Sequence, residues 1–273
     1  MRKKLILIAL TILFVHLSID IHAQTWQWVN RIGSGATNPQ DRPDEQLFDM
    51  KVDNAGNVYT CGRVQISGFI NDTSAYTTYG GYDIFIAKYN CHGDLLWYQT
   101  AGSASWGDEA RSLLLDSIGN IFVTGRVISV ISSSRCNFMG TLLGDVFDMF
   151  ICKLDPNGNL IWLKTGGNAL NHFGSIGKVM KYDYNGNLTI EYESGAGTLF
   201  PGFTILEGKH IGTFRISDGV MIDNVHISES NILIEDFDID SAKNYYVSGT
   251  FIADSLLIGN QLVHHINPDT NFP

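Results

Sequence analysis

The feature that most constrains the fold of this chain is an internal repeat, because a repeated segment forms the same local structure each time it occurs. Residues 83–97 read DIFIAKYNCHGDLLW and residues 148–162 read DMFICKLDPNGNLIW, with seven of fifteen positions identical at an offset of 65. A second pair, DNAGNVYTCGR at residues 53–63 and DSIGNIFVTGR at residues 116–126, recurs at an offset of 63. Two segments that recur in the same order and spacing indicate a structural unit of about 60 to 65 residues.

Weaker copies continue the series toward the C-terminus. DYNGN at residues 183–187 and DSAKNYYVSGT at residues 240–250 follow at offsets of 67 and 57. In the third copy, FRISDGVMI at residues 214–222 replaces the second half of the pattern and lacks the tryptophan. The sequence therefore predicts three full units and the opening of a fourth, with bounds near residues 30–97, 98–162, 163–222 and 223–273.

Each unit carries the pattern of two hairpins. Apolar residues between Leu47 and Val52 lead into Asp53-Asn54-Ala55-Gly56, and Val58 and Tyr59 follow, which indicates strand, tight turn, strand. Glycine supplies the positive φ of a short hairpin loop, and Asn or Asp bonds the local backbone. Four antiparallel strands per repeat form the blade of a β-propeller. The predicted fold class is therefore all-β, a β-propeller-like array of about three and a half four-stranded blades, which would be an incomplete propeller.

Tryptophans recur at the ends of the units. Trp97 and Trp162 close the last strands of the first two units, and Trp26 and Trp28 lie where a preceding unit would end. A large aromatic side chain can bury about 150 Å² or more at such an interface. We expect these residues to pack between blades, and a stacking platform for sugar rings is the alternative.

The N-terminus has the layout of a secretory signal peptide. Basic residues at 2–4, an apolar stretch at 5–15 and His22-Ala23-Gln24 predict a signal peptide of residues 1–23, cleaved after Ala23. The stretch is shorter than the roughly 20 residues of a membrane-spanning helix. The mature chain, residues 24–273, is therefore expected to be secreted or displayed at the cell surface, with no membrane span. The first cysteine, Cys61, is too distant to carry a lipid anchor.

Composition and charge exclude several classes of partner. Charged residues make up 17% of the chain, there are 28 glycines and 6 prolines, and the formal net charge is −10. The absence of a Lys/Arg run after the signal argues against nucleic acid and against anionic membranes. The cysteines show no CxxC or Cys/His metal spacing, so we expect buried small side chains and leave a disulfide open. They are Cys61, Cys91, Cys136 and Cys152.

The repeat resembles a known family. The pattern DxFxxKxxxxGxLxW, a short Gly-rich loop with an acidic residue, and LxxDxxGNxxxTG together resemble the bacterial SBBP beta-propeller repeat. The matching residues are Asp83, Phe85, Lys88, Gly93, Leu95, Trp97, Asp108, Asp116, Gly119, Asn120, Thr124 and Gly125. The resemblance is good from Leu47 to Trp162 and fades beyond. It implies an exported or cell-surface bacterial protein whose repeats serve as scaffold or interaction modules.

The chain departs from that family in two ways. Residues 63–82 and 126–145 lengthen the units and are expected to form longer strands or protruding loops. Three and a half units do not readily close a ring of six to eight blades. The expected explanations are a fragment, a small ring, or association with further blades or another chain.

The search for metal sites singles out Asp236, Asp238 and Asp240. An EF-hand loop needs glycine at its sixth position and a bidentate glutamate at its twelfth, where this chain has Ser241 and Val247. Alternating aspartates on a strand are better explained as one solvated face that leads into the turn. No metal site is assigned.

The search for catalytic groups is also negative. Asp108 and Glu109 are adjacent carboxylates, but acid–base chemistry needs two groups placed across a cleft, and their recurrence favours structural hydrogen bonding. His264-His265 has no neighbouring Cys or Glu, and nucleophile and nucleotide-binding motifs are missing. We assign no catalytic, metal or cofactor-binding residue and expect no cofactor.

Three functions remain open at this point. The first is a noncatalytic extracellular scaffold or binding module that presents loops to a protein or glycan at the cell surface. The second is a polysaccharide hydrolase or lyase with its site at the mouth of the propeller channel. The third is a structural spacer in a larger surface protein.

Overall fold

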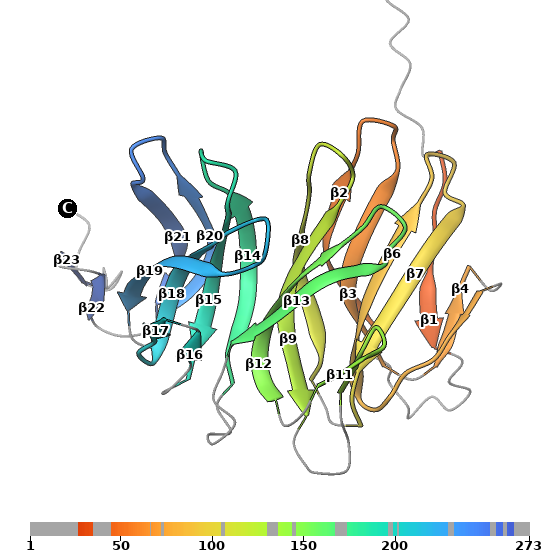
Figure 1. The fold of residues 1–273 in the computed structure, drawn as a ribbon, viewed down its shortest axis with the longest axis horizontal. Coiled ribbons are helices and arrows are strands. Elements are labelled where there is room, and N and C mark those ends of the chain that lie inside the picture. The colour runs from red at the N-terminus through yellow and green to blue at the C-terminus, as the bar shows by residue number, and fades with distance from the viewer. Residues whose placement is uncertain are drawn as a thin grey trace, which may run out of the picture.

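The computed structural model describes most of the chain as antiparallel strands (Figure 1). The described residues are 27–34, 45–65, 67–71, 74–104, 107–129, 136–143, 146–166, 174–195, 199–200, 202–228, 232–251, 255–258 and 261–264. None of them is helical, so the predicted all-β class is confirmed. The predicted signal peptide (1–23), Trp26 and His265 lie outside the described residues.

Sets of four strands follow one another along the chain, and within each set the strands are hydrogen-bonded in chain order. The first set is β2 (Gln46–Val52), β3 (Val58–Gln65), β6 (Tyr82–Tyr89) and β7 (Leu95–Gly102). The second is β8 (Glu109–Leu115), β9 (Ile121–Ser129), β12 (Val146–Leu154) and β13 (Leu160–Gly166). The third is β14 (Ile176–Tyr182), β15 (Leu188–Ser194), β18 (Gly208–Phe214) and β19 (Met221–Ser228). A fourth sheet contains β20 (Ile232–Ile239) and β21 (Tyr245–Phe251).

A short hairpin follows the second strand of every set. These hairpins are β4–β5 (Gly68–Ile70, Ser74–Tyr76), β10–β11 (Cys136–Phe138, Thr141–Leu143), β16–β17 (Leu199–Phe200, Phe203–Thr204) and β22–β23 (Ser255–Ile258, Gln261–His264). β4 pairs with β1 (Ile32–Ser34), and β10 pairs with β7, which extends the first set to a six-stranded sheet. The hairpin in the first long stretch thus pairs with β1, and the hairpin in the second pairs with β7, the last strand of the first set.

The turns between strands repeat one hydrogen-bonding pattern. Oδ1 of Asp116 accepts the backbone N–H of Ile118 (3.0 Å) and of Asn120 (2.8 Å), and Oδ2 accepts the Asn120 amide (2.6 Å). Gly119 has a φ of +85°, a conformation that glycine adopts without strain. Asp53, Asp155, Asp183 and Asp240 make the same set of bonds. These bonds confirm the prediction that Asp side chains accept hydrogen bonds from the turn backbone and that glycine supplies the positive φ.

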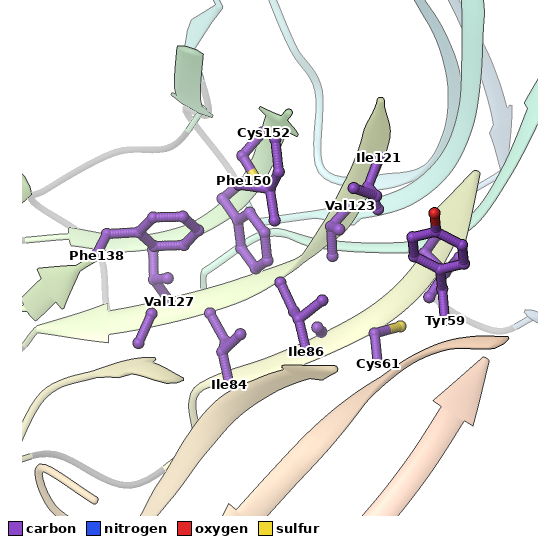
Figure 2. Packing of buried hydrophobic residues seen from close by; sticks show 14 of the residues in the cluster. Tyr59, Cys61, Ile84, Ile86, Ile121, Val123, Val127, Phe138, Phe150 and Cys152 are labelled. Atoms are coloured by element: carbon purple, nitrogen blue, oxygen red, sulfur yellow. The ribbon is translucent and has the colours of Figure 1, made fainter. Parts of the chain in front are cut away.

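Successive sheets pack face to face through apolar side chains. One cluster joins the first two sets and contains Tyr59, Cys61, Ile84 and Ile86 from the first with Leu113, Val123, Phe150 and Cys152 from the second (Figure 2). A second cluster joins Phe122, Met149 and Ile151 to Met180, Leu188, Ile190 and Tyr192. A third joins Ile211 and Ile227 to Ile232, Ile234 and Phe237. Since burying one such side chain contributes about 1.5–3 kcal/mol, these interfaces hold the stack together.

Tryptophans connect each sheet to a turn of the next. The Trp97 indole N–H donates to the carbonyl of Pro156 (3.1 Å), and its ring covers Gly158. Trp28 bonds the Cys91 carbonyl (3.0 Å) and covers Gly93 in the same way, and the Trp162 ring covers Gly219. The predicted packing of Trp28, Trp97 and Trp162 between units is confirmed.

Candidate functional site

The candidate functional site lies where β8 begins and contains three arginines around one carboxylate. The Glu109 side chain is 1% exposed. Its carboxylate accepts the guanidinium groups of Arg111 at 3.0 Å and Arg126 at 3.1 Å, and Arg63 lies at 3.4 Å. Arg63, on β3, is the last residue of the repeated segment 53–63. Arg126, on β9, is the last residue of the equivalent segment 116–126. Arg111 lies two residues after Glu109 on β8.

Aromatic rings hold two of the guanidinium groups in place. The Arg63 guanidinium lies 4.2 Å from the ring centre of Tyr82, and that of Arg111 lies 4.0 Å from the ring centre of Phe48. Such cation–π contacts contribute about 0.5–2 kcal/mol each. These contacts restrict long side chains that would otherwise be mobile, so binding of a ligand there would cost less conformational entropy.

The cluster gathers three positive side chains and remains partly open to solvent. Three guanidinium groups lie within 3.4 Å of the Glu109 carboxylate. The side chains of Arg63, Arg111 and Arg126 are 17%, 33% and 28% exposed. A planar guanidinium donates two parallel hydrogen bonds to a carboxylate, sulfate or phosphate. The arrangement is therefore suited to bind an anionic group.

The equivalent position of the third set has a glutamate and lysines in place of arginines. Glu193 replaces Arg126 there and pairs with Lys178 (3.0 Å) and Lys209 (2.5 Å). A second carboxyl, Glu191, is fully buried on the same strand, and burial raises its pKa to about 7. The third set thus has lysines and glutamates here, and the three-arginine cluster belongs to the junction of the first two sets.

Asp108, the sequence neighbour of Glu109, has separate partners. Its carboxyl accepts the backbone N–H of Ser103 (2.9 Å) and of Ile128 (2.5 Å). Burial, with a smaller contribution from nearby Asp83, raises its pKa to about 8. Asp108 and Glu109 therefore do not form a pair across a cleft, which agrees with the structural role that their place in the repeat favours.

The three aspartates of the candidate metal loop, Asp236, Asp238 and Asp240, each have a different partner. Asp236 pairs with Lys181 (3.0 Å), Asp238 bonds the backbone N–H of Ile239, and Asp240 forms the turn. Asp236 and Asp238 are exposed, as predicted for a solvated strand face. Among the described residues, no three His, Cys, Asp or Glu side chains are grouped as metal ligands.

The remaining candidates are the histidine pair and the four cysteines. His264 ends β23, while His265 is outside the described residues. All four cysteines are free thiols, so the open question of a disulfide is answered in the negative. Cys61, Cys136 and Cys152 are buried, and Cys91 is exposed.

The arginine cluster was not predicted from the sequence. One signal was present, since Arg63 and Arg126 close the repeated segments at residues 53–63 and 116–126. Their convergence on Glu109 depends on the stacking of two sheets, and Arg63 is 46 residues from Glu109.

Comparison with known proteins does not place the chain in a family. No family model matches it, and neither does any curated protein. Among solved structures, it is similar to a protein of unknown function from Bacteroides caccae, with a TM-score of 0.41 and 10% identity. The match covers 82% of this chain and 62% of the other, so this chain spans less than two thirds of that protein. A search of the described residues for a helix with the length and hydropathy to span a membrane found none.

Proposed function

We propose that the mature chain is an exported, noncatalytic binding module that holds an acidic group of an extracellular glycan in the arginine cluster. The observation that carries this proposal is the convergence of three partly exposed guanidinium groups on one buried carboxylate. Uronate and sulfate groups match the bidentate donors of arginine. The N-terminal sequence supports export, because residues 1–23 have the layout of a signal peptide.

The module is proposed to be a set of propeller blades of the SBBP type. Three features support this architecture: four-stranded antiparallel sets in chain order, apolar packing between successive sets, and the recurring contact of tryptophan with a turn glycine. Propeller blades pack face to face in this way and leave short edges exposed.

A noncatalytic role is supported by the use of the buried carboxyls. Asp108 is bonded to backbone N–H groups, and Glu109 is surrounded by arginines. Both are buried within the scaffold. A general acid or base needs to reach a substrate proton, and these groups are occupied by protein partners.

The test is binding of the mature chain to polygalacturonate and to neutral dextran by calorimetry. Binding to polygalacturonate is expected, with an affinity that falls as salt rises. Arg111→Gln and Arg126→Gln are each expected to weaken it about 10-fold, a loss of about 1.4 kcal/mol. Arg215→Gln is the matched control, because Arg215 is a half-exposed arginine paired with Asp218 in a turn. Equal binding of both polymers, or equal affinity of all variants, would rule the proposal out.

A second candidate, a spacer in a longer stack of blades, is favoured by an exposed apolar row on β2. Leu47, Met50 and Val52 are 53%, 60% and 58% exposed. Exposed apolar patches mark surfaces that another protein covers. Light scattering of the mature chain and of a Met50→Lys, Val52→Lys variant tests this candidate. A spacer predicts self-association that the variant abolishes, and a monomer under all conditions contradicts it.

A further inference from the structure

The fourth sheet is attached to the third set by side-chain packing. Among the strands that the structure describes, β20 and β21 pair only with each other, and Figure 1 shows them near one end of the stack. The contact with the third set is the apolar cluster that joins Ile211 and Ile227 to Ile232, Ile234 and Phe237. Since no strand pairing crosses this junction within the described residues, its stability depends on what the two faces bury.

One carboxyl group is buried in this junction. Glu191 on β15 is paired in register with Val179 on β14 and with Ile211 on β18. Val179 and Ile211 both belong to the packing against the fourth sheet. Because side chains of directly paired residues lie on the same face of a sheet, Glu191 also faces β20 and β21. Glu191 is 0% exposed, so its carboxyl lies between the two sheets and away from water.

The equivalent places at the other two junctions hold smaller side chains. Cys61, Thr124 and Glu191 are each the fourth residue of the second strand in their set. Cys61 belongs to the apolar cluster between the first two sets. The Thr124 hydroxyl donates to the Phe150 carbonyl (2.7 Å). A carboxyl group at this place is therefore a feature of the junction between the third and fourth sheets.

The Glu191 carboxyl has no hydrogen-bond partner at either oxygen among the described residues. The charged groups that act on it are Lys178 on β14, Glu193 on β15 and Lys209 on β18. Both lysines are ion-paired with Glu193, at 3.0 and 2.5 Å. An ionised carboxylate is costly to bury without a donor, whereas its protonated form is neutral. Burial accordingly outweighs the two lysines and raises the pKa of Glu191 to about 7.

The elements packed against this face supply no compensating cation. Neither β20 nor β21 contains Lys, Arg or His, and His226 on β19 packs against His210, with ring centres 4.9 Å apart. Tyr245 on β21 joins the apolar cluster. The other titratable groups of these strands are exposed, namely Asp223 on β19, Glu235, Asp236 and Asp238 on β20, and Tyr246 on β21. The charge on Glu191 is thus left to solvent, which reaches it only when the sheets separate.

We propose that Glu191 makes the docking of the β20–β21 sheet onto the third set dependent on pH. While Glu191 is protonated, the two faces bury a neutral group and stay together. When Glu191 is ionised, separation of the sheets hydrates the charge, so the undocked state is favoured. The docked state binds the proton more tightly, and docking therefore weakens as pH rises from about 4.5 to 7. The inference is independent of the proposed function, because the arginine cluster lies at the first junction.

The test is amide hydrogen exchange of the mature chain between pH 5 and 8, followed by mass spectrometry and corrected for the intrinsic effect of pH on exchange. The protection factors of β20 and β21 are expected to fall at least about 10-fold across this range. Glu191→Gln keeps the shape and removes the titration, so its protection factors are expected to stay constant. Glu191→Thr copies Thr124 of the second set and is a second neutral replacement with the same expected result.

Glu235→Gln is the matched control, because Glu235 is an exposed glutamate on β20. It is expected to keep the pH profile of the wild-type chain. Asp83 and Asp108 are present in all of these proteins, so the difference between wild type and the Glu191 variants isolates Glu191. Constant protection of β20 and β21 in the wild type, or a wild-type decline in both Glu191 variants, overturns the inference. Polygalacturonate binding at the arginine cluster is a separate measurement that neither result changes.

Discussion

The indole N–H of Trp97 donates to the carbonyl of Pro156 at 3.1 Å, and this bond joins the last strand of one set to a turn of the next. The neighbouring Gln99 amide bonds the Gly158 carbonyl (3.0 Å) in the same turn. Trp28 and Asn30 repeat the arrangement one unit earlier, with bonds to Cys91 (3.0 Å) and Gly93 (2.8 Å). A residue pattern that recurs in sequence thus makes a contact that recurs between sheets.

Removing the Trp97 side chain is expected to destabilise the stack. Trp97→Ala should lower the free energy of unfolding by about 3 kcal/mol, because it deletes a large ring at an interface. Trp97→Phe retains an aromatic ring and loses the hydrogen bond, so a loss of about 1 kcal/mol is expected from that bond. Urea denaturation followed by circular dichroism measures both, and equal stability of the three proteins would contradict the assigned contact.

Gly158 is expected to tolerate a side chain less well than Gly186. Both have positive φ, +83° and +76°, so alanine is strained at either position. A Cβ at Gly158 would lie 2.9 Å from the Trp97 ring, while nothing lies within 4 Å at Gly186. Gly186→Ala should cost about 1 kcal/mol from the backbone alone, and Gly158→Ala clearly more. Equal unfolding midpoints for these two variants would show that the ring does not cover the turn.

Stability is expected to fall as pH rises through neutrality. Burial raises the pKa of Asp83 to about 7 and that of Asp108 to about 8, well above the ordinary value of 3.8 for an aspartate. A raised carboxyl pKa means that the folded state binds more protons than the unfolded state between about pH 4 and 8. Each carboxyl then contributes a slope of at most about 1.4 kcal/mol per pH unit.

Asp83→Asn removes one of these contributions and reduces the other, because Asp83 also raises the pKa of Asp108. Oδ2 of Asp83 accepts the Tyr79 N–H (2.5 Å), and Oδ1 has no partner among the described residues, so an amide can take its place. The variant is expected to show a shallower decline between pH 4 and 8 and higher relative stability at pH 8. Denaturation curves collected across this range test the sign, and a wild-type slope in the variant would refute it.

The four thiols are expected to differ in reactivity. Cys91 is exposed, whereas burial raises the pKa of Cys61, Cys136 and Cys152 above the usual thiol range. Since the thiolate is the nucleophile, Ellman's reagent should modify Cys91 in the folded protein and all four in denaturant. A Cys91→Ser variant should be unreactive until it unfolds. Rapid native modification of a second cysteine would contradict the burial.

Local features of this chain could be predicted from sequence, and contacts between sheets could not. The turn at Asp116 follows from its own residues, and the position of Trp97 follows from the repeat. The hairpins after β3 and β9 were missed because residues 63–82 and 126–145 share no clear pattern. The arginine cluster depends on stacking that brings Arg63 to Glu109.

The central claim is that the repeats fold into equivalent sheets, each joined to the next by a tryptophan over a turn glycine. NMR of the labelled mature chain tests it through cross-relaxation between Trp97 ring protons and the Gly158 Hα protons. The account predicts strong cross-peaks and upfield-shifted Hα resonances for Gly158, and likewise for Gly93 with Trp28 and Gly219 with Trp162. Ordinary glycine shifts and no cross-peaks to the indole rings would contradict the account.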